Sequence, residues 1–181
     1  MLNRFFSIMK EQKGFTLVEL LIAVAITAVI STGLMMTITQ LFSVNSADSN
    51  RMAAVKQVEN ALHYLNRDVQ MSTASKITED NGDSYPRNFP LTLKWTDYTG
   101  EAAQDYKVDY TLDANRDLLR TQTIDDNTTT ATTTIVAHDI DDLSSDYSFN
   151  GEVLTVNLTA SVEGYKSATE SRTLQVKPRV D

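Results

Sequence analysis

The sequence has no cysteine, and only two of its 181 residues are histidine. The missing cysteines exclude disulfides, thiolate catalysis and zinc sites built on cysteine. Basic residues are also few, since 16 Lys and Arg stand against 24 Asp and Glu, for a formal net charge of -8. Binding nucleic acid over a broad surface requires clustered Lys and Arg, so this charge argues against a nucleic-acid partner.

Sequence motifs of catalysis are absent as well. The chain contains no HExxH, P-loop or GxSxG string. His63 lies beside an apolar helical stripe and His138 lies in an acidic stretch, and both are interpreted as structural residues. We therefore predict no enzyme, no catalytic residue and no cofactor.

One acidic segment resembles the start of a calcium loop. Asp113, Asn115 and Asp117 occupy the first three ligand positions of an EF-hand, but Leu118 and Ile124 stand where Gly and Glu are required. The segment is therefore interpreted as a β-turn between two strands, and no metal site is predicted. A calcium site of another type remains an alternative, and a second acidic cluster consists of Asp139, Asp141 and Asp142.

A long apolar run follows a short basic segment. No residue from Leu20 to Phe42 is charged, and about 20 helical residues cross a hydrocarbon core. The basic residues before the run predict a cytoplasmic N-terminus. A secretory signal peptide has a shorter apolar run. A plain signal anchor fits the run but leaves Glu19 unexplained, although its carboxylate could reach the membrane interface.

The start of the run carries the string Lys13-Gly14-Phe15-Thr16-Leu17-Val18-Glu19. It resembles the processing site of type IV prepilins and pseudopilins. The resemblance implies that a prepilin peptidase cuts between Gly14 and Phe15 and methylates the new Phe15 amine. It also implies that Glu19 pairs with the Phe15 amine of a neighbouring subunit in a filament, which would compensate a buried charge. Major pilins commonly have a proline where this chain has Met36, so melting of the helix on assembly is not implied.

Beyond the apolar run, the spacing predicts that the helix continues to Met71. Apolar residues recur three or four positions apart, as expected for one buried helical face. This stripe consists of Met52, Val55, Val58, Leu62, Leu65 and Val69. The polar residues predicted to lie off the stripe are Arg51, Lys56, Glu59, Asn60, Arg67 and Asp68. A helix end is expected at Ser72–Ser75, where hydroxyl side chains compete for backbone hydrogen bonds.

After the helix, the period changes to two, which is typical of strands. Strands are predicted around residues 91–96, 106–112, 135–136, 147–149, 153–162 and 174–176, with a loop at 79–86, and the short segment 118–123 is ambiguous. Asn150-Gly151 predicts a hairpin turn. The segment Thr128–Thr134 is predicted to be a loop that leads into a strand, with a β-branched edge strand as the alternative. The fold class is α+β: a long N-terminal helix packed on one antiparallel sheet or two.

The second half of the chain is similar to J-type minor pseudopilins and related minor pilins. The similarity lies in Asn66–Val69, Tyr110–Leu112, Leu119-Arg120, Ile140–Leu143 and Val176–Arg179. With the N-terminal string, it implies a leader at 1–14, a transmembrane and filament-core helix at 15–42, an amphipathic helix at 43–72 and a β-rich head at 73–181.

These resemblances imply a structural function. The chain would be a minor subunit that helps to initiate or cap a type IV pilus, a competence pilus or a type II secretion pseudopilus. It would cross the cytoplasmic membrane once, with its head outside, before entering a filament. Its partners would be other pilins or pseudopilins, the prepilin peptidase, the inner-membrane assembly platform and, before assembly, membrane lipid.

Two alternatives follow from the same residues. The head could be an adhesin or ligand-binding module that a filament or anchor displays, and exposed aromatic residues clustered on it would favour this function. The chain could also be a membrane-anchored surface protein that is never processed at Gly14.

Overall fold

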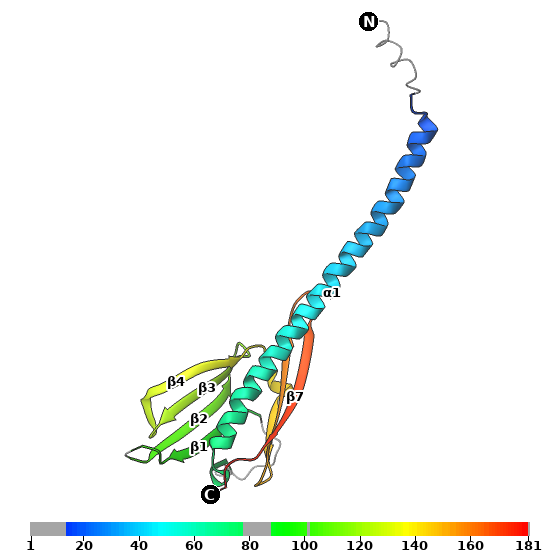
Figure 1. Ribbon diagram of the computed structural model, residues 1–181. Coiled ribbons are helices and arrows are strands. Elements are labelled where there is room, and N and C mark those ends of the chain that lie inside the picture. The colour runs from blue at the N-terminus through cyan, green and yellow to red at the C-terminus, as the bar shows by residue number, and fades with distance from the viewer. Residues whose placement is uncertain (1–13, 78–87, 101, 181) are drawn as a thin grey trace, which may run out of the picture. The chain divides into compact units, whose positions relative to one another are not determined.

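A computed structural model describes residues 14–77, 88–100 and 102–180. The predicted loop at 79–86 lies outside these residues. The helices are α1 (Leu17–Met71), α2 (Ala74–Ile77) and the 3₁₀ turn η2 (Asp142–Ser144). The strands are β1 (Leu91–Asp97), β2 (Gln104–Leu112), β3 (Leu118–Ile124), β4 (Asn127–Ala137), β5 (Asp146–Phe149), β6 (Leu154–Val162) and β7 (Ala168–Val176) (Figure 1). The chain divides into two compact units between Val44 and Asn45, within α1.

The second unit contains the end of α1 and two antiparallel sheets. The strand orders are β1-β2-β3-β4 and β5-β6-β7, so within each sheet every strand pairs with its neighbour in the sequence. This confirms the predicted α+β class, and the number of sheets is two. The predicted end of the helix at Met71 is also confirmed. There the Ser72 hydroxyl donates to the Val69 carbonyl over 2.8 Å, a bond that competes with continuation of the helix.

Short turns join the strands. Gly151 has a φ of 90° in the connection between β5 and β6, which confirms the predicted Asn150-Gly151 turn. Asp125 and Asp126 both have a φ of 52° between β3 and β4, as a type I′ turn requires.

The prediction of a loop at Thr128–Thr134 is wrong. Strand β4 begins at Asn127 and includes the whole threonine tract at one edge of its sheet, as in the alternative prediction. Threonine is branched at Cβ and suits an extended backbone, and this outweighs the polarity that suggested a loop. A register shift between Gln122 and Ile124 leaves Thr128–Ala131 as a bulge.

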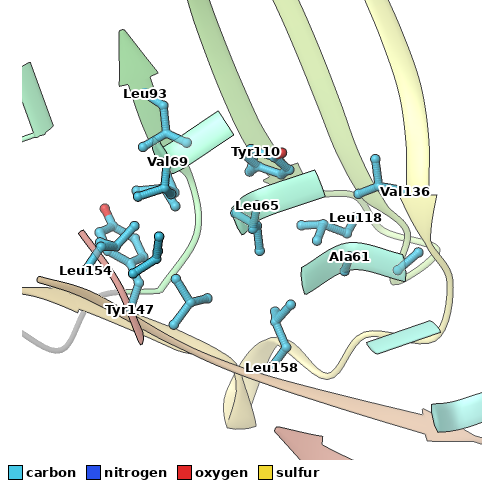
Figure 2. Packing of buried hydrophobic residues seen from close by; sticks show 14 of the residues in the cluster. Ala61, Leu65, Val69, Leu93, Tyr110, Leu118, Val136, Tyr147, Leu154 and Leu158 are labelled. Atoms are coloured by element: carbon cyan, nitrogen blue, oxygen red, sulfur yellow. The ribbon is translucent and has the colours of Figure 1, made fainter. Parts of the chain in front are cut away.

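The buried face of α1 is rotated from the predicted stripe. Its buried residues are Ala54, Val58, Ala61, Leu65, Asp68 and Val69. Met52 was predicted to be on the stripe but is 73% exposed. The two alanines were missed because their small side chains carry a weak hydropathy signal, although they let the helix approach the strands closely. Figure 2 shows Ala61, Leu65 and Val69 between residues of the first sheet, such as Tyr110 and Leu118, and residues of the second, such as Leu154 and Leu158.

Asp68 was predicted to lie off the stripe, yet it is 1% exposed. Its Oδ2 accepts hydrogen bonds from Arg120 Nε at 2.5 Å and from the Tyr110 hydroxyl at 2.6 Å. Its Oδ1 accepts from Arg120 Nη2 at 3.2 Å and from Arg67 Nε at 3.3 Å. Four donors thus satisfy the carboxylate, which explains how a charge is tolerated in the core.

This cluster of Asp68, Tyr110 and Arg120 changes the acid–base properties of its members. Burial, followed by the charge of Asp68, raises the pKa of the Tyr110 hydroxyl well above its ordinary value. For Arg120, burial opposes the charged form, but the hydrogen bond and charge of Asp68 outweigh it and the pKa is raised. Both shifts favour the protonated form of the donor, in which it can bond to Asp68.

We predict that Asp68→Ala lowers the free energy of unfolding by about 3–5 kcal/mol, because it leaves Arg120 buried without its counter-ion. The double variant Asp68→Ala/Arg120→Ala should lose much less than the sum of the two single losses. Trp95 is the only tryptophan and is 6% exposed, so its fluorescence during denaturant unfolding of the full chain in detergent reports on this unit.

The control is Arg172→Ala. It breaks the pair between Arg172 Nη1 and Glu59 Oε1, 2.8 Å apart, whose side chains are 41% and 57% exposed. An exposed pair contributes about 1 kcal/mol at most. Equal losses for Asp68→Ala and Arg172→Ala, or additive losses in the double variant, would contradict the role given to the cluster.

Candidate functional site

The candidate site is the start of α1, where the predicted processing residues lie. Gly14, Phe15 and Thr16 precede the helix and are not helical. The Thr16 carbonyl accepts the first helical hydrogen bond, from Leu20 N at 3.1 Å, and the Thr16 hydroxyl accepts from Glu19 N at 3.2 Å. Thr16 is therefore the N-cap residue, and its hydroxyl satisfies one amide that the helix leaves free.

The cap places Glu19 at the third helical position. A Thr followed three residues later by Glu is the capping-box pattern, and a carboxylate in the first turn is favoured by the positive end of the helix dipole. The capping box and the helix dipole therefore explain a glutamate at position 19 within the helix itself, in addition to the pairing with a neighbouring subunit that the resemblance implies. Among the described residues, no hydrogen bond or ion pair involves its carboxylate, which is exposed.

The Gly14–Phe15 bond lies in open, non-helical backbone. A Cβ added at Gly14 would meet no atom within 4 Å, and the Phe15 side chain is 83% exposed. A protease binds its substrate in an extended form, and this bond needs no unwinding of α1 to adopt one. The structure thus places Gly14 and Phe15 directly before α1 and Glu19 in its first turn, as their closeness in sequence requires.

From Leu17 to Val44, α1 has an apolar surface. It contains a window long and apolar enough to cross a membrane, and none of that window is buried. Its hydroxyl groups bond to carbonyls of the preceding turn: Thr27 to Ala23 over 2.7 Å, and Thr32 to Ala28 over 2.8 Å. Thr37 bonds in the same way to Gly33 over 3.0 Å. These three threonine hydroxyls are satisfied within the helix, as a hydrocarbon environment requires.

The acidic loop of Asp113–Asp117 forms the turn predicted between β2 and β3. Asp113 Oδ1 accepts from the backbone N of Asn115 at 2.9 Å and of Asp117 at 2.8 Å. Asp117 Oδ1 lies 2.7 Å from Nδ1 of His138, which is exposed. His138 thus has a structural partner. Among the described residues, no three acidic or histidine side chains are placed to hold a metal ion.

Arg116 joins the two acidic segments that the sequence singled out. Its Nη2 donates to the carbonyls of Asp139, at 3.1 Å, and Ser161, at 2.5 Å, and its Nη1 lies 3.3 Å from Glu163 Oε1. The Arg116 guanidinium thus lies between the two backbone carbonyls and the Glu163 carboxylate. These contacts could not be inferred from the sequence, because Arg116 lies between β2 and β3 and its partners Ser161 and Glu163 lie more than 40 residues away.

A family model described as the prokaryotic N-terminal methylation motif matches residues 9–35. The match contains Gly14, Phe15 and Glu19, together with the first part of the apolar helix, and it is a type IV pilin-like signal. No curated protein and no solved structure matches the chain. The match ends at residue 35, so the similarity of the second half to J-type minor pseudopilins remains a prediction.

We predict that Thr16→Ala weakens the first turn of α1 by about 1 kcal/mol, because the Glu19 amide loses its acceptor. Amide hydrogen exchange of residues 17–20 in detergent micelles should become about fivefold faster. Thr16→Ser keeps the hydroxyl and should exchange like the original chain. Thr27→Ala, whose hydroxyl bonds farther along α1, should leave this turn unchanged, and an equal effect of both alanine variants would contradict the cap.

Proposed function

We propose that the chain is made as a membrane-anchored precursor, cut between Gly14 and Phe15 and methylated on the Phe15 amine. The mature chain then enters a filament as a minor pilin or pseudopilin. The observation that carries this proposal is the methylation motif at residues 9–35, placed directly at the start of an apolar helix. The processing enzyme is a prepilin peptidase, and the other partners are pilin-like subunits, the assembly platform and membrane lipid.

The charge distribution supports the anchoring step. Residues 1–14 contain Arg4, Lys10 and Lys13 against Glu11, and the next charged residue after Glu19 is Asp48. Basic residues before the membrane favour a cytoplasmic N-terminus and a head on the other side. The 23 residues from Leu20 to Phe42 extend about 35 Å as a helix, close to the thickness of a bilayer core.

Glu19 is the residue that favours filament assembly over a plain anchor. A carboxylate in the membrane-embedded part of a helix costs a few kcal/mol unless it reaches water or a counter-charge. Cleavage would create a positive amine on Phe15, four residues away. The capping position holds the Glu19 side chain at the same helix end as that amine, so a neighbouring subunit with the same N-terminus can provide the opposite charge.

The exposed aromatics do not favour the adhesin alternative. Among the described residues, the strongly exposed tyrosines are Tyr98 and Tyr165. Tyr165 follows Gly164, which contacts Asn50 of α1. Tyr98 follows β1, in which the Lys94 carbonyl accepts from Thr73 N just past the end of α1. About 30 Å of helix separates these two regions, so the tyrosines do not form one binding surface.

We predict that Gly14→Val blocks processing and leaves an uncut precursor in the membrane, because a branched side chain enters the protease site at the cut bond. The original chain should begin at methylated Phe15. Intact mass spectrometry of the membrane fraction distinguishes the two. The fold should be unaffected, since nothing lies within 4 Å of a Cβ at Gly14.

Gly33→Ala is the matched control for this experiment. A Cβ at Gly33 also meets no atom within 4 Å, and the position lies in the apolar helix away from the cut. This variant should be cut normally. An original chain that keeps residue 1 in a cell with an active prepilin peptidase would refute the processing step.

We predict that Glu19→Ala is inserted and cut normally but enters filaments about tenfold less or worse, because a neighbour's amine is left unpaired in apolar surroundings. The measurement is the share of the chain in sheared filaments, relative to the membrane. Glu59→Ala, which removes an exposed carboxylate farther along the same helix, should assemble normally. Unimpaired assembly of Glu19→Ala would refute the pairing role.

A further inference from the structure

The outer edges of the two sheets differ in how they are protected against pairing with another strand. An exposed edge normally carries charges, proline, a short strand or a cover. At the edge of β1, the Lys94 carbonyl is bonded to Thr73 N at 3.0 Å. Strand β5 has only four residues. Strand β7 contains Glu170 and Arg172.

Strand β4 lacks three of these protections, because it contains no charged residue and no proline and it is not short. Its 11 residues, NTTTATTTIVA, are uncharged, and those from Asn127 to Ile135 are all exposed. It is the last strand of its sheet, and no other described strand pairs with its outer edge. Two protective features are present, because register shifts leave Thr128–Ala131 as a bulge and Val136 as a second irregularity, and both interrupt a regular edge. The regular part is Thr132–Ile135, paired residue by residue with β3.

We propose that this edge binds the β4 edge of a second copy of the chain, antiparallel, so that two four-stranded sheets become one eight-stranded sheet. The pairing is centred within Thr132–Ile135. The proposal rests on the membrane anchoring given above, because both copies must be held at one surface.

The first reason for choosing a second copy is the side-chain pairing already present. Thr121 and Thr133 are register partners in β3 and β4, and their hydroxyl oxygens lie 3.0 Å apart. Another β4 on the outer side would place threonine against threonine again, and such cross-strand pairs are favourable. A second copy offers only this edge, since β1, β5 and β7 are protected in it as well.

The second reason is charge. Each chain has a net charge of -8, so two copies repel each other over most of their surfaces. The uncharged β4 is where that repulsion is least.

The contact is expected to be weak between free chains in solution and to be strengthened when both copies are anchored in one membrane. One strand pair buries far less than the roughly 1,200 Å² of a stable interface. Two copies anchored in one bilayer meet at a much higher effective concentration than free chains. The dimer is therefore expected for the anchored chain and not for a dilute soluble form.

The absence of cysteine makes a direct test possible, in which single cysteines replace residues 130–135 one at a time. Directly opposed residues of an antiparallel pair have Cβ atoms about 4.5–5.5 Å apart, close enough for a disulfide after slight movement. A two-fold pair brings one residue opposite its own copy, so oxidation of cell membranes should give a homodimer at one position and little at its neighbours. Dimer mass is read on a non-reducing gel.

Three controls keep the outcome interpretable. Thr169→Cys places the cysteine on the exposed, charged edge strand β7 and should give no homodimer. Adding Ala131→Lys to the best cross-linking variant should abolish its homodimer, because a charge is placed on the edge, whereas Ala131→Thr should not. Trp95 fluorescence checks that each variant is folded.

Equal cross-linking along β4, no cross-linking, or an adduct only with a different protein would each overturn the proposal. These results are separate from those on function. A chain cut at Gly14 and assembled into filaments, but without the homodimer, leaves the proposed function intact. An uncut chain that still forms the homodimer refutes the processing step and not the pairing.

Discussion

The structure depends on one constraint: α1 must suit two different surroundings without a break in its backbone hydrogen bonding. From Leu17 to Val44 its side chains are mostly apolar and exposed, and from Ala54 to Val69 it presents a buried face to two sheets. A helix is one of the few structures that satisfies all its own backbone groups, so the same element serves in lipid and in a protein core. Only the pattern of side chains differs along α1: the first part is apolar all round, and the second part has a single buried face.

The last turn of the helix is where this constraint is hardest to meet. The C-terminal end of a helix is negative, and the last turn of α1 contains no basic residue. Asp68 nevertheless lies there, buried. Arg120 and Tyr110 of the first sheet offset both the charge of the carboxylate and the unfavourable dipole. The helix can therefore pack on this sheet only in the rotation that brings Asp68 to Arg120, and hydrophobic contacts alone would fix that rotation less firmly.

Periodicity predicted the elements that repeat regularly, and it failed where packing depended on single side chains. The end of α1 at Met71 and the strands around Leu93, Val108 and Val156 followed from periods of 3.6 and two. The rotation of α1 about its axis did not follow from periodicity. Alanine has too weak a hydropathy signal to be counted as buried, and aspartate is expected on the exposed face. The candidate site was predictable because its residues are adjacent in the sequence. The cap by Thr16 could have been found from the Thr16-Leu17-Val18-Glu19 pattern, which is a capping box.

Threonine shows most clearly why composition alone does not determine a role. Thr16 precedes the helix, and its hydroxyl accepts a hydrogen bond from the Glu19 amide that the helix leaves free. Thr27 lies inside the helix, and its hydroxyl turns back to the Ala23 carbonyl, which makes a polar residue acceptable in lipid. In β4 the backbone is extended, so successive threonines point to opposite faces and Thr133 meets Thr121 across the sheet. The backbone conformation decides whether a hydroxyl bonds to its own helix or is presented to a neighbour. Threonine hydroxyls are therefore already bonded within a helix, whereas at the edge of a sheet they are available to pair with another strand.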